Sequence, residues 1–323
     1  MKKILLIVLL LVVTAGIVFA LGPRPDTNDT VTFDPSSLGE DLDAYLENTE
    51  AGIANLVDGA EKEIVWANAF RKEKTPYAVI YVHGFSATKH ETRPVADNVA
   101  KSLGANLYFT RFQGHGRDGH GLVEATVQGW ANDFAEAIEI GKRIGDKIII
   151  IAVSNGATIS TWGLAKPEYS GSVAGIVFGS PNFELTGIST SLANIPWAET
   201  ILPAIAGANR SWEPANEEHG KWWTTSYPSR AIFPMTAMLK LTKEIDKSGI
   251  KVPALFIYHP QDRVVVPAEI EKAIDEWGGP VEVLKIEESS DQYNHVIMGD
   301  ILSPENTGPA TQNIIDWVNS LAD

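Results

Sequence analysis

The sequence predicts an α/β fold with a mostly parallel central sheet flanked by helices and a small helical cap insertion. The first observation is that short apolar runs alternate with amphipathic stretches from residue 63 onward. Strands buried on both faces of a parallel sheet have this composition, and the helices between them cover the faces. The second observation is one long interruption of the alternation, over residues 182–250, which is rich in tryptophan.

The individual elements follow from composition and periodicity. β-Branched and aromatic runs predict strands over 63–67, 78–82, 106–110, 147–153, 173–179, 252–258 and 281–286. Apolar residues at helical spacing predict helices over 42–56, 94–103, 130–144 and 313–321. The core is thereby divided into two parts, 37–181 and 251–323, on either side of the insertion. In such sheets ligands bind outside the carboxyl ends of the strands.

The insertion at 182–250 is too long for a plain loop, which predicts a small helical cap over the strand ends. Its aromatic and methionine side chains suit the wall of an apolar pocket. Most of these side chains are expected to hold the cap against the core. One or two are expected to touch substrate, and the candidates are Trp197, Trp222 and Trp223.

Residues 1–21 have the pattern of a signal peptide or an N-terminal membrane anchor. Lys2 and Lys3 precede an uncharged apolar run at 4–21, which is just long enough to span a bilayer as a helix. The lysines favour an N-terminus on the cytoplasmic side. The protein is therefore expected to be exported, either to the periplasm or extracellular space or anchored to the cytoplasmic membrane facing outward. Prolines and turn-forming residues at 22–36 predict a linker.

The composition excludes some partners and some chemistry. The chain has 323 residues and a formal net charge of −15, which argues against nucleic acid because phosphates are bound through Lys and Arg. It has no cysteine, which excludes disulfides, a lipid-modified cysteine, a cysteine nucleophile and thiolate metal sites. The sequence does not indicate an oligomeric state.

Ser154 is the candidate nucleophile. The apolar run 147–153 ends at this serine, and Asn155 and Gly156 open a stretch with helical composition. A strand, a sharp turn and a helix in this order expose a serine hydroxyl beside free backbone N–H groups. The usual pattern is Gly-x-Ser-x-Gly, and this chain has Ala152 at the first position. The pentapeptide alone fits an ordinary serine at a strand-to-helix turn equally well.

A serine hydroxyl needs a base, and the base needs an orienting carboxylate. In this architecture the order along the chain is serine, acid, histidine. His295 follows the last predicted strand, and Asp262 follows the strand before it. Both are therefore expected at the same sheet edge as Ser154. Asp291 is a reserve candidate for the acid and Asp275 a weaker one.

Attack on a carbonyl creates an oxyanion that needs two N–H donors placed in advance. We expect one from Asn155, directly after the nucleophile, and the other from Phe85 in the loop after the strand 78–82. Gly84 allows this loop to bend close to Ser154. His83 precedes the serine and is expected to fix the loop by hydrogen bonds rather than to act as the base.

Together these motifs resemble the α/β-hydrolase superfamily. The resemblance rests on His83-Gly84-Phe85, the segment 111–116, the segment 152–156, Asp262 and His295-Val296. Within the superfamily the chain is most similar to the group of monoacylglycerol lipases, lysophospholipases, bacterial carboxylesterases and serine aminopeptidase domains. This resemblance implies that no metal or organic cofactor is needed and that the Gly-His-Gly loop at 114–116 is not catalytic.

The expected activity is hydrolysis of carboxylic esters, with a short or medium acyl chain or a lipid-like one, through a covalent acyl-enzyme. A peptidase or amidase would use the same three residues, with Glu213, Glu217 or Glu218 of the cap binding a substrate amine. An acyltransferase would differ only in the nucleophile that releases the acyl group. A binding protein on an inactive scaffold is disfavoured by the order of the three residues.

Overall fold

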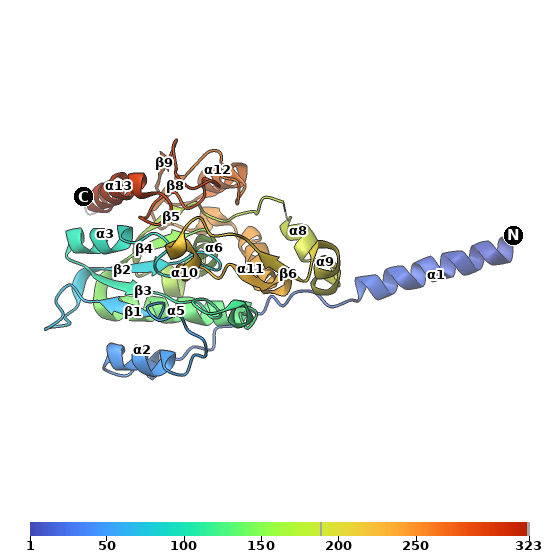
Figure 1. The fold of residues 1–323 in the computed structure, drawn as a ribbon, viewed down its shortest axis with the longest axis horizontal. Coiled ribbons are helices and arrows are strands. Elements are labelled where there is room, and N and C mark those ends of the chain that lie inside the picture. The colour runs from blue at the N-terminus through green and yellow to red at the C-terminus, as the bar shows by residue number, and fades with distance from the viewer. Residues whose placement is uncertain (188, 322–323) are drawn as a thin grey trace.

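The computed structural model describes residues 1–187 and 189–321. One layered body holds the sheet, its flanking helices and the cap, and the N-terminal helix projects from the cap end of this body (Figure 1).

A seven-stranded sheet forms the centre, with strand order β1-β3-β2-β4-β5-β8-β9. All neighbouring strands are parallel except the edge pair β1 and β3, which is antiparallel. The predicted α/β class with a mostly parallel sheet is therefore confirmed. The strands are β1 Glu63–Val65, β2 Thr75–Val82, β3 Asn106–Phe109, β4 Gly145–Val153, β5 Val173–Gly179, β8 Ala254–Tyr258 and β9 Val281–Lys285.

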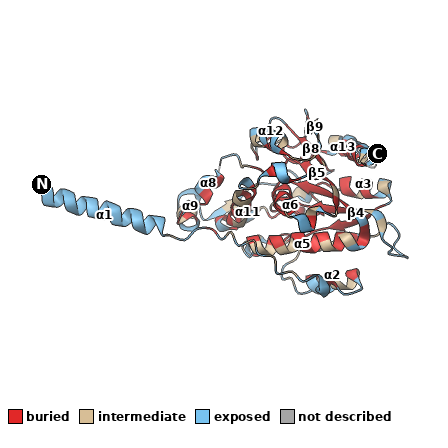
Figure 2. Cartoon of the chain, turned by 180° about the vertical axis from the view of Figure 1, so that it is seen from behind, coloured by how far each residue is buried: buried red, intermediate tan, exposed pale blue. Residues whose placement is uncertain are grey.

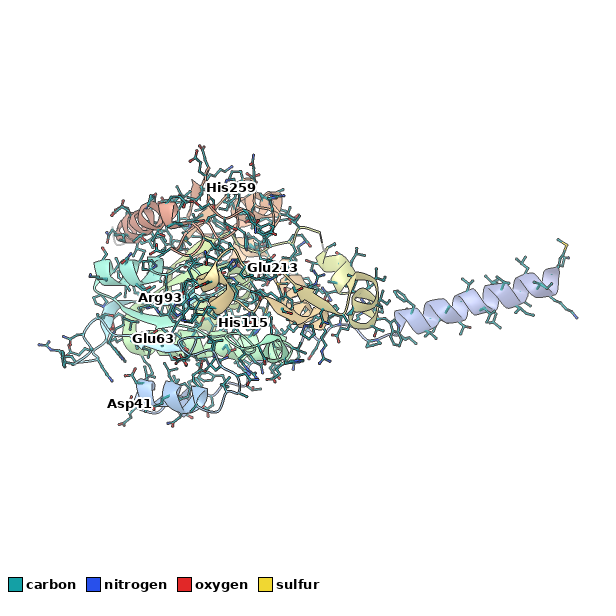
Figure 3. The ribbon with its side chains drawn as sticks, in the orientation of Figure 1. Asp41, Glu63, Arg93, His115, Glu213 and His259 are labelled. Atoms are coloured by element: carbon teal, nitrogen blue, oxygen red, sulfur yellow. The ribbon has the colours of Figure 1, made fainter. Side chains whose placement is uncertain are left out.

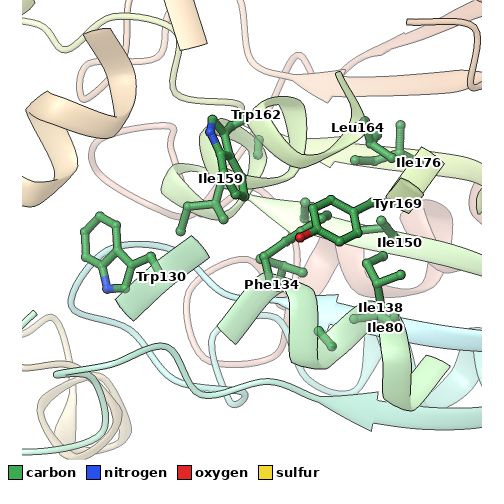
Figure 4. Close-up of a cluster of buried hydrophobic side chains, with 14 of the residues drawn as sticks. Ile80, Trp130, Phe134, Ile138, Ile150, Ile159, Trp162, Leu164, Tyr169 and Ile176 are labelled. Atoms are coloured by element: carbon green, nitrogen blue, oxygen red, sulfur yellow. The ribbon is translucent and has the colours of Figure 1, made fainter. Parts of the chain in front are cut away.

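The sheet separates two apolar clusters, because successive side chains of a strand point to opposite faces. On β4, Ile148, Ile150 and Ala152 belong to one cluster, while Ile149, Ile151 and Val153 belong to the other. The first cluster is covered by α5 (Val127–Ile144), α6 (Asn155–Leu164) and α12 (Pro267–Glu276), and Figure 4 shows its packing around Phe134 and Trp162. The second is covered by α3 (Val95–Leu103) and α13 (Pro304–Ser320).

Several helices differ in length from the prediction. Helix α2 (Leu42–Glu50) ends before residue 56, and α13 begins at Pro304 rather than near 313. Proline at the first turn of a helix lacks only an N–H that would have no partner there, so Pro304 marks a start. Short helices α4 (Gly119–Leu122) and α7 (Pro167–Ser170) and the 3-10 turn η1 (Pro35–Leu38) complete the core.

The cap region is mainly helical and includes one small two-stranded ribbon. Its last helix, α11, packs on α6, and its buried side chains join the core cluster. This helix therefore anchors the cap to the body. The elements are α8 Thr190–Ala193, α9 Ala198–Ala206, β6 Asn209–Ser211, α10 Glu217–Trp222, β7 Ser226–Pro228, η2 Ser229–Ile232, α11 Phe233–Lys243 and η3 Lys247–Gly249.

The N-terminal segment consists of a helix and an ordered strap. Helix α1 (Lys2–Ala20) has a mean hydropathy of 2.8 and no buried residue, and Figure 2 shows it exposed along its whole length. The strap, residues 21–34 between α1 and η1, lies on the body. The indole of Trp162 donates to Asp29 at 2.8 Å, and the backbone N–H of Thr32 donates to Asn132 at 2.7 Å.

Candidate active site

Ser154 lies at the turn between β4 and α6 in a strained backbone conformation. Its φ is 50° and its ψ is −115°, a region that non-glycine residues rarely occupy. Its N–H donates to the carbonyl of Gly179 at 2.9 Å. At Gly156 a Cβ would lie 2.3 Å from the carbonyl oxygen of Val82. Glycine at this position therefore lets α6 pack against β2 and hold the turn.

Ala152, where the usual pattern has glycine, is accommodated by the core. The residue is fully buried and pairs with Val82 on β2 and Phe178 on β5. Its methyl group belongs to the apolar cluster under α5 and α6. The substitution adds packing on this face and leaves the turn at Ser154 intact.

Ser154, His295 and Asp262 form one chain of hydrogen bonds. Nε2 of His295 lies 2.9 Å from Oγ of Ser154, and Nδ1 of His295 lies 2.8 Å from Oδ2 of Asp262. The other carboxylate oxygen of Asp262 accepts the backbone N–H groups of Val264 and Val265 at 2.8 and 3.0 Å. These two bonds fix the carboxylate, which in turn fixes the imidazole.

Asp291 holds the loop that carries His295 rather than the imidazole. Its Oδ2 accepts the backbone N–H of His295 at 2.9 Å and that of Val296 at 3.0 Å. Asp275, the weaker candidate for the acid, is exposed on α12. Of the three candidates, Asp262 is the carboxylate that contacts the ring.

The environment of His295 favours its protonated form. Burial alone would lower the pKa of this imidazole, but the negative charges of Asp262, Glu91 and Asp291 outweigh burial, and the pKa is raised from its ordinary value. An imidazole with a raised pKa accepts a proton from a hydroxyl more readily.

Asn155 directly follows Ser154 in sequence, and Phe85 lines the same cavity as Ser154. Asn155 opens helix α6, and Phe85 lies in the loop after β2. Neither N–H donates to an acceptor among the described residues. His83 shapes this loop: its Nδ1 lies 2.9 Å from the carbonyl oxygen of Gly84, and its Nε2 accepts the N–H of Phe112 at 3.1 Å. Burial lowers the pKa of His83 to about 4, so the ring is neutral at pH 7.

Glu91 is a buried carboxyl group that the sequence did not single out. One of its oxygens accepts the N–H of Gly84 at 2.8 Å and the hydroxyl of Tyr81 at 3.1 Å. Burial raises the pKa of Glu91 to about 7. Its neighbours in sequence, Lys89 and His90, are polar as well, so no local pattern distinguishes it.

Two other histidines are engaged elsewhere, and both are labelled in Figure 3. Nδ1 of His115 lies 3.2 Å from the carbonyl oxygen of Phe112. Nε2 of His259 lies 3.0 Å from the carbonyl oxygen of Glu287.

A cavity of about 400 Å³ opens above Ser154, and its walls are mainly apolar. Trp212, Trp223 and Tyr227 line it from the cap, Leu185 lines it from the first residues of the insertion, and Phe85 and Val264 line it from the core. A pocket of this size and character suits a ligand with an apolar group and one polar reacting centre.

The predicted substrate-contacting tryptophans are placed differently from one another. Trp223 lines the cavity, whereas Trp222 stacks on His90 with ring centroids 3.5 Å apart. Trp197 lies at the far end of the cap, where its indole Nε1 donates to the carbonyl of Val18 at 3.3 Å. Trp197 and Trp222 do not line this cavity, because the ring of Trp197 lies against the end of α1 and that of Trp222 lies against His90.

The acidic residues of the cap lie outside the cavity. Glu213, which is labelled in Figure 3, is exposed, as are Glu217 and Glu218. Glu218 accepts the indole N–H of Trp222 at 2.7 Å. None of these three carboxylates lines the space above Ser154.

Comparisons with known proteins identify the family of the chain. The family model described as serine aminopeptidase, S33, matches residues 73–300. A thermostable monoacylglycerol lipase from Bacillus sp. (strain H-257) is 25% identical over 202 residues, which are 62% of this chain and 76% of that protein.

Solved structures share the fold at low sequence identity. A metagenome-derived lipolytic enzyme superposes with a TM-score of 0.66 at 17% identity, over 82% of this chain and 99% of that one. A monoacylglycerol lipase from Paleococcus ferrophilus gives 0.58 at 14% identity, over 80% and 98%. A soluble variant of the Saccharomyces cerevisiae monoglyceride lipase gives 0.54 at 14% identity, over 82% and 93%. The protein belongs to the serine aminopeptidase (S33) family of α/β-hydrolases.

Proposed function

We propose that the protein is a serine hydrolase of carboxylic esters, with Ser154 as nucleophile, His295 as general base and Asp262 as its orienting acid. The observation that carries this proposal is the continuous hydrogen-bonded chain from Ser154 through His295 to Asp262 beneath an apolar cavity. The relatives named as lipases and monoacylglycerol lipases support the choice of an ester as the bond that is cleaved.

In the first half-reaction, Oγ of Ser154 attacks the ester carbonyl carbon while Nε2 of His295 takes the hydroxyl proton. The Asp262 carboxylate stabilises the imidazolium that forms. The carbonyl oxygen becomes an oxyanion, which the free N–H groups of Phe85 and Asn155 stabilise. The bond to the alcohol oxygen then breaks, and this oxygen leaves with the proton from His295.

In the second half-reaction, water replaces the alcohol. His295 takes a proton from the water as its oxygen attacks the acyl carbon of the Ser154 ester. The tetrahedral species again places its oxyanion on the N–H groups of Phe85 and Asn155. Collapse returns the proton to Oγ of Ser154, and the carboxylic acid is released.

The cavity favours an ester with an apolar acyl chain, of short to medium length or lipid-like. Aromatic and aliphatic walls stabilise a chain by removing its surface from water. A peptidase that selects a substrate amine would need a carboxylate free to bind it, and the cap carboxylates Glu213, Glu217 and Glu218 lie outside the cavity. The two carboxylates that line the cavity, Glu91 and Asp291, already accept backbone N–H groups of the loops beside Ser154 and His295. The geometry therefore favours ester substrates over peptides with a free N-terminus.

The proposal extends to the location of the protein. Helix α1 is apolar enough to cross a membrane, and Lys2 and Lys3 at its start favour a cytoplasmic N-terminus. We place the hydrolase on the outer side of the cytoplasmic membrane, with α1 retained as an anchor.

The test is hydrolysis of p-nitrophenyl butyrate and of a monoacylglycerol by the wild type, Ser154→Ala and Ser160→Ala. Ser160 is a matched control, since it is buried in the same helix and its hydroxyl has no partner among the described residues. The expected result is loss of hydrolysis in Ser154→Ala alone. Equal rates for wild type and Ser154→Ala would overturn the assignment.

A further inference from the structure

The end of the cap nearest α1 is an apolar surface with little protein around it. We call residues 189–208, which hold α8 and α9, the cap apex. Its only charged residue is Glu199, and only Ala198 is buried within α9. Leu192 is 59% exposed and Ile205 is 79% exposed. Ile201, Leu202 and Pro203 of α9 are half-buried, so the apolar surface without a protein partner is the one that Leu192 and Ile205 expose. Exposed apolar surface of this kind is typical of a site that meets an apolar partner.

The cap apex is bonded directly to the segment that leaves α1. The backbone N–H of Trp197 donates to the carbonyl of Pro23 at 2.6 Å, and its indole N–H donates to Val18 in the last turn of α1 at 3.3 Å. Arg24 donates to the carbonyl of Asn194 at 2.9 Å. A Cβ at Gly22 would lie 1.9 Å from the Trp197 indole, so the chain passes close against this ring.

The orientation of the apex is fixed further along the strap. Asp29 accepts the indole N–H of Trp162 on α6, and Thr32 bonds to Asn132 on α5. The strap is therefore held at the cap and again on the body. Figure 1 shows α8 and α9 at the end of the body from which α1 departs.

The length of α1 places the apex at a membrane surface. Its 19 residues span about 28 Å at about 1.5 Å per residue, which matches the hydrocarbon core of a bilayer at about 30 Å. The chain contacts Trp197 within a few residues of the end of this helix. Trp197 therefore lies where α1 would leave the bilayer. A tryptophan with an apolar ring and a hydrogen-bonded N–H is favoured at the membrane–water interface.

We propose that the cap apex docks on the same bilayer that α1 spans, with Leu192 and Ile205 inserted among the lipids. The proposal rests on the retention of α1 as an anchor. Two independent features support a lipid surface as the occupant: the apolar, nearly uncharged face and its direct bonds to a helix long enough to cross a membrane.

The docked apex would lead from the membrane toward the cavity. The N–H of Ser229 donates to the carbonyl of Ala208 at 2.8 Å, and its hydroxyl donates to Gly207 at 2.6 Å. These bonds join the apex to η2, whose last residue, Ile232, lines the cavity above Ser154. A lipid ester could then pass from the bilayer to the cavity along protein rather than through water.

The absence of cysteine from the chain allows a direct test on the full-length protein. Single-cysteine variants Leu192→Cys and Ile205→Cys carry an environment-sensitive fluorophore and are reconstituted in phosphatidylcholine–phosphatidylglycerol vesicles containing doxyl-labelled lipid. Phe70→Cys is the matched control. Phe70 is a fully exposed apolar residue in the loop that enters β2. Because β2 is parallel to β4, this loop lies at the end of the strands opposite Ser154 and the cap.

The expected result is lipid quenching at positions 192 and 205 and none at position 70. Quenching at 205 no greater than at 70 would overturn the proposal. A shift of the probe fluorescence at position 205 toward an apolar environment that grows with the amount of protein per vesicle, without quenching by doxyl-labelled lipid, would also overturn the proposal. That result would indicate contact with a second copy of the chain. Flotation of the vesicles tests retention of α1 separately, and p-nitrophenyl butyrate hydrolysis tests the proposed chemistry separately.

A second readout concerns substrate presentation. Ile205→Glu is expected to lower the rate on a long-chain monoacylglycerol in vesicles at least tenfold and to leave p-nitrophenyl butyrate hydrolysis unchanged, whereas Phe70→Glu changes neither. Equal effects of Ile205→Glu on both substrates, or no effect on either, would contradict a docking role.

Discussion

One carboxylate oxygen of Glu91 accepts the backbone N–H of Gly84 at 2.8 Å, directly before Phe85 in the loop beside Ser154. Glu91 is buried and lines the cavity. Its carboxylate is also one of the groups whose charge raises the pKa of His295. The residue therefore joins the loop that carries a proposed oxyanion donor to the electrostatics of the base.

We predict that Glu91→Gln shifts the pH profile, because glutamine keeps an acceptor for Gly84 but removes the charge. His295 must be neutral to take a proton, and its raised pKa places the rise of kcat/KM with pH above the ordinary histidine value of about 6.5. Without the Glu91 charge, the rise should move to lower pH. Profiles on p-nitrophenyl butyrate check this, and an unchanged profile would show that Glu91 does not act on the base.

Glu91 should also set a pH dependence of stability. Its pKa is raised by burial from 4.5 to about 7 in the folded protein, so the folded state binds more protons between these values. Stability is then greatest below the unfolded pKa and falls as pH rises through this window. The unfolding temperature of the wild type should therefore fall relative to that of Glu91→Gln as the pH rises from about 4.5 to 7. A difference that is constant with pH would refute this account.

Asp262 and Asp291 should have separable effects, since Asp262 contacts the imidazole and Asp291 holds its loop. Asp262→Asn is expected to lower kcat by roughly 10³–10⁴-fold with little change in unfolding temperature. Asp291→Asn should lower kcat about tenfold and reduce stability by about 1 kcal/mol. Steady-state kinetics and thermal unfolding measure both, and a larger kinetic loss at Asp291 would reverse the assignment of the acid.

The turn at Ser154 should tolerate glycine at 152 and reject alanine at 156. A Cβ at Gly156 would meet the backbone oxygens of Val82 and His83 at 2.3 and 2.7 Å, so Gly156→Ala must displace the helix or the strand. We expect a loss of about 1–3 kcal/mol and of most activity. Ala152→Gly should cost about 1 kcal/mol and retain activity, and retained activity in Gly156→Ala would contradict the proposed geometry of the turn.

The two neighbouring tryptophans should separate substrate selection from cap packing. Trp223→Leu enlarges the cavity and should shift the preferred acyl length of p-nitrophenyl esters, changing relative kcat/KM by roughly tenfold. Trp222→Leu removes the stack on His90 and should lower the unfolding temperature without altering the preference. Identical length profiles in both variants would argue against Trp223 as a wall of the acyl site.

The fold and the order of the candidate residues could be predicted because they depend on local patterns. Apolar runs set the strands, and the strand ends bring Ser154, Asp262 and His295 to one sheet edge. Glu91 could not be found, because its partner Gly84 is set by how the loop after β2 folds back on itself. The different places of Trp197, Trp222 and Trp223 depend on tertiary packing of the cap, which composition does not encode.

The most direct measurement is mass spectrometry of the full-length protein treated with a fluorophosphonate, followed by mapping of the modified peptide. A nucleophile activated by His295 should react once per chain, at Ser154, and Ser154→Ala should not react while Ser160→Ala reacts as wild type. A folded protein that is unmodified, or is modified at another residue, would contradict the central claim that Ser154 is the nucleophile.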